Sequence, residues 1–168
     1  ATHLLLATLR KVLGEHVVQK GQNITKDRSR FDFPNPEKLT DDQIKKVEEM
    51  INDVIESELP VSYVVMPKED AISTGAIHAF NEKYADTVKV YYVGNSLEEA
   101  YSKEFCGGPH VTNTKEIGHV TINKQEKIGS GIIRIYLVID NKNAGISSKT
   151  KNWYWEFFGC FDWGTMDY

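Results

Sequence analysis

The stretch LTDDQIKKVEEMINDVIESELP, residues 39–60, has the pattern of an amphipathic helix. Thr40 and Gln43 have the spacing of a capping box, which marks the N-terminus of a helix. Pro60 cannot continue a helix, so the helix is expected to end before it. Between these limits, apolar residues recur every three or four positions and predict one buried face. That face consists of Ile44, Val47, Ile51, Val54 and Ile55.

Segments with strand-like composition lie on both sides of this helix. VVQKG (17–21) and RFDF (30–33) predict a hairpin in which Phe31 and Phe33 share one face. Gln19 and Lys20 would then stand at the end of the first strand. Four more strands are predicted after the helix, at VSYVVM (61–66), TVKVYYVG (87–94), HVTIN (119–123) and IIRIYLVID (132–140).

Two further helices complete the prediction. Apolar residues recur at helical spacing near the start of the chain, up to Gly14, which places His3 in the first turn of a helix. They are Leu5, Leu9, Val12 and Leu13. Pro67 can open a short helix that ends near Gly75. Helices and strands do not alternate in regular βαβ units, so we expect an α+β fold with a largely antiparallel sheet packed with helices.

The composition excludes several classes of protein. The chain has 168 residues and a formal net charge of −4, which argues against binding nucleic acid by charge alone. No apolar run approaches the roughly 20 residues of a membrane span. Two cysteines cannot form a disulfide framework, so a cytoplasmic setting is expected. There is no initiator Met and no export signal, and the start is expected to be a cut within a longer protein.

A change in composition after Asp140 predicts a boundary near residue 141. NKNAGISSKTKN (141–152) is polar and linker-like, and the residues after it include all three tryptophans. We therefore expect one folded domain over 1–140, followed by a linker and an aromatic tail of unknown role over 141–168.

The loop EFCGGPHV, residues 104–111, carries the strongest chemical signal. Gly107 and Gly108 permit backbone conformations that bring the side chains of Cys106 and His110 to one point. Thiolate sulfur and imidazole nitrogen are preferred ligands of Zn²⁺. One Cys-x-x-x-His pair is a weak signal, because structural zinc sites usually have four protein ligands. On these residues alone the loop is either half of a zinc site or a glycine-rich turn with a buried thiol.

This loop, taken with THLLLATLRKVLGEHVVQKG, RFDF, NEKY and EIGHVTI, resembles the editing domain of bacterial-type alanyl-tRNA synthetase. That domain is shared with threonyl-tRNA synthetases and with free-standing alanyl-tRNA editing proteins. The segments occur in the family's order over residues 1 to about 139. The resemblance implies ester hydrolysis that removes serine or glycine from the 3′ end of the alanine tRNA, as part of an alanine-tRNA ligase.

The resemblance also implies a cofactor and site residues. His3, Cys106 and His110 match three zinc ligands of the family, and the fourth, a histidine, would lie two residues before Ala1. Thr2 and Gln19 match positions that bind the misattached amino acid. Gln19 is also the residue implied in catalysis, where an amide can position groups but cannot act as a base. ATP would be used only in the separate catalytic domain of a parent synthetase, whose other domains are expected partners.

Three positions depart from the family pattern and keep alternatives open. Pro109 stands where alanyl-type members typically have threonine, which favours a threonyl-type activity that clears serine from the threonine tRNA. Asn81 replaces a glycine, and Arg134 keeps one of two adjacent arginines. The absent first histidine favours a different alternative, a non-catalytic module that binds zinc or tRNA.

Overall fold

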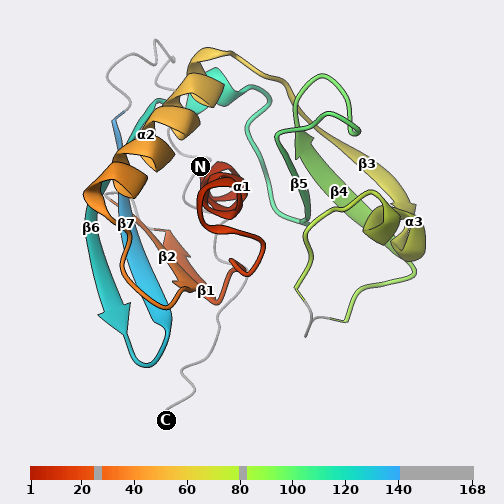
Figure 1. Ribbon diagram of the computed structural model, residues 1–168. Coiled ribbons are helices and arrows are strands. Elements are labelled where there is room, and N and C mark those ends of the chain that lie inside the picture. The colour runs from red at the N-terminus through yellow and green to blue at the C-terminus, as the bar shows by residue number, and fades with distance from the viewer. Residues whose placement is uncertain (25–27, 80–82, 141–168) are drawn as a thin grey trace.

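The computed structural model describes residues 1–24, 28–79 and 83–140. The predicted boundary near 141, the aromatic tail over 141–168 and Asn81 lie outside the described residues. Helices and antiparallel strands are mixed, which confirms the predicted α+β class. The strands form two sheets, however, and helix α1 (Thr2–Leu13) lies between them (Figure 1).

The larger sheet has four antiparallel strands in the order β1-β2-β7-β6. These are β1 (Gly21–Ile24), β2 (Ser29–Pro34), β7 (Ile132–Asp140) and β6 (His119–Ile128). The β1–β2 hairpin was predicted, and Phe31 and Phe33 of β2 are fully buried as expected. Its first strand begins later than predicted: Val17 is fully buried in the core, but the pairing with β2 starts only at Gly21. Gln19 and Lys20 therefore precede β1, although the Lys20 amide already donates to the Asp32 carbonyl at 2.8 Å.

Helix α2 (Asp41–Glu56) packs on this sheet and confirms the prediction from residues 39–60. The Gln43 amide donates to Thr40 Oγ1 at 3.2 Å, and the Thr40 amide donates to Gln43 Oε1 at 3.0 Å. Four of the five predicted core residues of the helix are buried, namely Val47, Ile51, Val54 and Ile55, while Ile44 is half-buried. Together with α1 and the sheet they form the main hydrophobic core.

The smaller sheet has the order β3-β4-β5. It comprises β3 (Val61–Pro67), β4 (Thr87–Val93) and β5 (Ser102–Phe105), and the short helix α3 (Lys68–Ser73) covers one of its faces. Strand β5 was not predicted, because SKEF is short and polar and its buried residues are Ser102 and Glu104. It contacts α1 and leads directly into the Cys106 loop.

The segment after this loop returns the chain to the larger sheet. The 3-10 helix η1 (Thr114–Ile117) begins at fully buried Thr114, whose hydroxyl donates to the Val54 carbonyl at 2.9 Å. This contact fixes the end of the loop against the last turn of α2. None of the helices in the described residues is both long and apolar enough to cross a membrane.

Candidate metal centre

Three side chains from two distant parts of the sequence meet beside the N-terminal end of α1. His3 comes from the first turn of α1, and Cys106 and His110 come from the loop that follows β5. Their ligand atoms all lie within 4.8 Å of one another. We call these three residues the His3 cluster. The structure thus brings together the three residues that the resemblance assigned to zinc.

The hydrogen bonds of the two histidines fix which ring nitrogens face the cluster. His3 Nδ1 lies 2.6 Å from a carboxylate oxygen of Glu104, and His110 Nδ1 lies 2.8 Å from the Gly108 carbonyl. Both partners are acceptors, so each Nδ1 carries a proton. The Nε2 atoms lie 2.7 Å apart. One proton lies between the two Nε2 atoms while His3 is protonated, and its release would leave two lone pairs directed at the same point, where a metal cation could replace it.

The electrostatic surroundings also favour a cation. Burial alone would lower the pKa of His3, but the Glu104 carboxylate and hydrogen bonds to Cys106 and Glu104 raise this pKa to about 10. Burial raises the pKa of the Cys106 thiol, whereas hydrogen bonds with His110 and His3 lower it, with a net value of about 6. Cys106 is therefore mainly thiolate near neutral pH, which is the form that binds metals. Sulfur and two imidazole nitrogens are the donor set that Zn²⁺ prefers, so these residues fit the ion that the resemblance implies.

Two residues beside the cluster were not identified from the sequence. Glu104 holds His3, and its side chain is only 9% exposed. The ring of Tyr91, on β4, stacks on His110 with centroids 3.6 Å apart. Tyr91 and Glu104 are directly opposed in the register of β4 and β5. Glu104 stands two positions before Cys106, and that proximity is the signal that could have identified it.

The two predicted substrate-binding residues differ in exposure and in their position along the chain relative to His3. Thr2 is half-buried and precedes His3 in the first turn of α1. Gln19 is exposed, in the segment between α1 and β1. Among the described residues, no hydrogen bond joins Gln19 to the His3 cluster. The roles of Thr2 and Gln19 therefore remain predictions.

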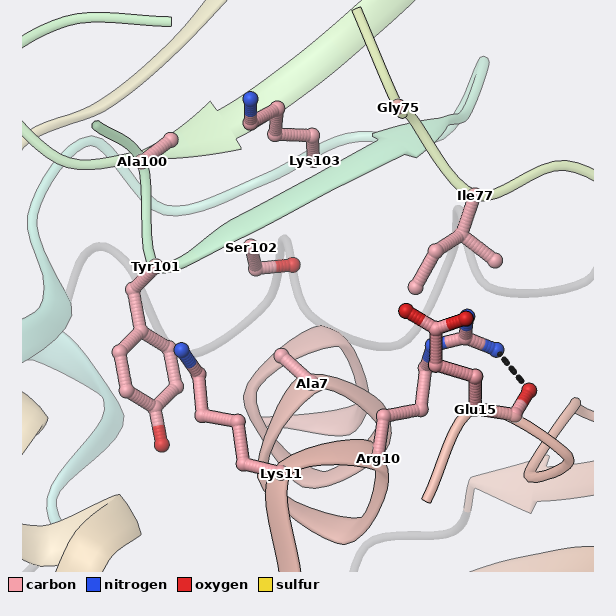
Figure 2. Close-up of a pocket in the computed structure, with 10 residues that line it drawn as sticks. All are labelled: Ala7, Arg10, Lys11, Glu15, Gly75, Ile77, Ala100, Tyr101, Ser102 and Lys103. Carbon is pink, nitrogen blue, oxygen red and sulfur yellow. Dashed lines mark hydrogen bonds between the residues drawn. The ribbon is translucent and has the colours of Figure 1, made fainter. Parts of the chain in front are cut away.

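A hollow of about 220 Å³ lies along α1, on the side that faces β5 (Figure 2). Lys11 extends over the Tyr101 ring with its Nζ 4.6 Å from the centroid, and Arg10 donates to the Glu15 carbonyl at 2.7 Å. Ser102 lines the hollow and also hydrogen-bonds Glu104 Oε1 at 3.4 Å. The hollow therefore adjoins the residue that orients His3.

Comparison with known proteins identifies the family to which the chain is related. Residues 88–136 match the family described as the second additional domain of threonyl and alanyl tRNA synthetase. The alanine–tRNA ligase of Treponema denticola is 48% identical over 141 residues, which cover 84% of this chain. The chain belongs to the alanyl-tRNA synthetase family. This finding confirms the resemblance that the sequence motifs predicted.

Two other alanine–tRNA ligases match a similar share of this chain. The alanine–tRNA ligase of Borrelia hermsii is 50% identical over 139 residues, or 83% of this chain. That of Sinorhizobium medicae is 45% identical over 140 residues, or 80% of this chain. The chain spans 23% of the length of the Treponema and Borrelia relatives and 16% of the Sinorhizobium relative. The chain thus matches one part of each of these longer relatives.

Proposed function

We propose that this domain hydrolyses the ester bond between serine or glycine and the 3′ end of the alanine tRNA, at a site that contains zinc. The observation that carries the proposal is the convergence of His3, Cys106 and His110, with their N, S and N donors, in a chain of the alanyl-tRNA synthetase family. The substrate is tRNA bound with help from other domains of the synthetase, and the setting is the cytoplasm. Any use of ATP belongs to a separate catalytic domain.

The proposed reaction answers a physical limit on amino-acid selection. A pocket shaped for alanine cannot exclude the smaller glycine. It also discriminates against a ligand that carries one additional hydroxyl by a factor of only about 10². A second site that recognises the serine hydroxyl through hydrogen bonds restores accuracy, because alanine has no group to make those bonds. We assign this recognition to Thr2 and Gln19.

The chain's own residues would divide the work between metal binding and substrate positioning. His3, Cys106 and His110 would hold Zn²⁺, and Glu104 would keep the His3 ring in the orientation that directs Nε2 inward. When bound, the ion supplies positive charge that can orient the substrate and its attacking water. Gln19 would position substrate or water by hydrogen bonding, since its amide does not titrate. Its exposure leaves its amide accessible to a bound substrate.

The test is hydrolysis of four aminoacyl-tRNAs by the 168-residue chain: seryl-, glycyl- and alanyl-tRNA(Ala), and seryl-tRNA(Thr). The proposal predicts that the first two are hydrolysed and alanyl-tRNA(Ala) is spared. Gln19→Ala should reduce the discrimination between serine and alanine. Gln22→Ala, which changes an exposed amide on β1, is the matched control and should leave it unchanged. Equal hydrolysis of seryl- and alanyl-tRNA(Ala) by the unmodified chain would contradict the proposal.

Two other activities are distinguished by the same assay. Pro109 favours a threonyl-type activity, which would appear as preferential hydrolysis of seryl-tRNA(Thr). A non-catalytic zinc or tRNA-binding module would bind zinc and hydrolyse none of the four substrates.

A further inference from the structure

One face of the smaller sheet is partly covered by α1 and by His110 of the loop after β5, and it is exposed at its β3 end. Glu104 on β5 and Tyr91 on β4 are opposed in register, and Tyr91 is in turn opposed to Tyr63 on β3. These three residues therefore form one row across one face of the sheet. At its β5 end, Glu104 contacts His3 of α1. At its β3 end, Tyr63 is 51% exposed, and its neighbour Val65 is 61% exposed.

The open part of this face combines aromatic rings with a positive charge. Tyr63 and Tyr91 lie with ring centroids 5.2 Å apart. Lys89, opposed to Val65, places its Nζ 4.4 Å from the Tyr63 centroid and 6.0 Å from the Tyr91 centroid. Lys89 forms no ion pair with any acidic residue in the described part of the chain. We call Tyr63, Val65, Lys89 and Tyr91 the aromatic face.

The aromatic face is continuous with the His3 cluster. Tyr91 stacks on His110 at 3.6 Å, and the His110 and His3 rings stack with centroids 4.8 Å apart. Neighbouring strands lie about 4.8 Å apart, so Tyr63, two strands from Glu104, is roughly 10 Å from the residue that orients His3. A short piece of extended polymer spans that separation.

An exposed aromatic ring beside a cation that forms no ion pair is a common means of binding single-stranded nucleic acid. Bases stack on the rings and a phosphate is attracted to the ammonium group. A covering protein segment of apolar character would instead bury the Lys89 charge without a partner, which is costly. The charge therefore favours a nucleic acid as the occupant over another part of a synthetase.

We propose that the aromatic face binds the single-stranded 3′ end of an RNA and leads its terminal nucleotide to the His3 cluster. A base stacks on Tyr63, and a backbone phosphate lies near Lys89. The direction toward the cluster rests on the proposed function, whereas binding of single-stranded RNA by the face does not. The face thus supplies local contacts to an RNA end that the chain's net charge of −4 would not attract.

The test is a titration of the 168-residue chain with a fluorescent eight-nucleotide single-stranded RNA that ends in a free 3′ hydroxyl. Tyr63→Ala should weaken binding roughly tenfold, within the range for loss of one stacking ring, while Tyr63→Phe should retain it. Lys89→Ala should reduce the slope of log affinity against log salt concentration by about 1, as expected for the loss of one phosphate contact. Ile72→Ala is the matched control, because Ile72 is also an exposed apolar residue (42%) but belongs to α3 on the opposite face.

Three results would overturn the aromatic-face proposal. These are equal binding by Tyr63→Ala and the unmodified chain, equal competition by a blunt RNA duplex, and no RNA binding by the unmodified chain. The last result would indicate that another part of the synthetase covers the face. Circular dichroism and zinc content, both expected to be unchanged in Tyr63→Ala, exclude a folding defect.

Hydrolysis of seryl-tRNA(Ala) separates this inference from the proposed function. If the chain binds RNA through Tyr63 but hydrolyses no aminoacyl-tRNA, the proposed function fails and the face remains. If the chain hydrolyses seryl-tRNA(Ala) and Tyr63→Ala changes neither KM nor RNA binding, the face fails and the proposed function remains. When both are correct, Tyr63→Ala raises KM more than it lowers kcat.

Discussion

The two sheets in the described part of the chain differ in what they bury and in what they leave exposed. The four-stranded sheet packs against α1 and α2 around large side chains, and Phe31, Phe33, Ile133, Ile135 and Leu137 are fully buried. The three-stranded sheet has a small second core of Ala71, Ala76, Val88 and Val90, and its other face is partly open. Most of the buried apolar residues therefore pack on the first sheet, whereas the polar and aromatic residues next to the His3 cluster lie on the second.

The candidate metal centre lies where these two regions meet. His3 is held by α1, which packs in the main core, whereas Cys106 and His110 follow the edge strand β5 of the smaller sheet. The Thr8 and Tyr101 hydroxyls, 2.7 Å apart, join the same two regions. The distance between the ligand atoms thus depends on how the regions are held together, and a metal ion would add a further link between them.

The largest expected effect compares the two cores directly. Phe31→Ala should lower the free energy of unfolding by about 3–5 kcal/mol, because it leaves a large cavity in the main core. Val90→Ala, in the small core, removes two methyl groups and should cost roughly 2 kcal/mol. Urea denaturation of both variants measures the difference. Equal losses would show that the two sheets contribute equally to stability.

The next largest effect concerns the His3 cluster, which lies where the two regions meet. His110→Ala removes a ligand atom and should weaken zinc binding by more than about 100-fold. Loss of a residue that only orients a ligand already weakens metal binding by about 10–100-fold. Hydrolysis of seryl-tRNA(Ala) should fall with it. The control is His119→Ala, which removes an exposed histidine on β6 outside the cluster. Competition with a zinc-binding dye measures the affinities, and similar values for the two variants would contradict the assignment.

A smaller effect is expected for the residue that orients His3. Glu104→Gln keeps the shape but weakens the bond to His3 Nδ1, so zinc affinity should fall by about 10–100-fold. Glu99→Gln changes an exposed carboxylate in the loop before β5 and should leave affinity unchanged. If Glu104→Gln also leaves affinity unchanged, His3 is held by α1 alone.

The smallest effect is expected for a substitution outside the His3 cluster, at the N-terminus of α2. Thr40→Ala removes the oxygen that accepts from the Gln43 amide and should cost about 1 kcal/mol of stability. Zinc affinity should not change, because α2 carries none of the cluster residues. Thr121→Ala, an exposed position on β6, is the control for loss of a threonine hydroxyl. A change in zinc affinity in Thr40→Ala would show that α2 and the cluster are coupled.

The elements with strong local signals were predictable from the sequence. Helix α2 has its capping box and its apolar period within one stretch, and β7 is a continuous run of strand-forming residues. Strand β5 has no such signal, because its Ser102 and Glu104 are buried by contacts with α1, about a hundred positions away. The division into two sheets also depends on long-range pairing, such as β2 with β7, which local patterns do not encode.

The candidate site was predictable only in part for the same reason. The Cys106 loop suggested a metal site, and the resemblance added His3, which the fold brings to the loop. Glu104 had a signal in its position two residues before Cys106, whereas Tyr91 reaches His110 only through the fold and had none. The aromatic face likewise exists only because Tyr63, Lys89 and Tyr91 come together across two strands.

If zinc in the His3 cluster supports hydrolysis of mischarged tRNA, removal of the metal should abolish that hydrolysis. Zinc content by elemental analysis and hydrolysis of seryl-tRNA(Ala) are measured on the same sample before chelation, after chelation and after zinc is restored. The expected result is one zinc ion per chain, loss of activity when the metal is removed and recovery when it is restored, with no recovery in Cys106→Ala. Full hydrolysis by the zinc-free chain would contradict it.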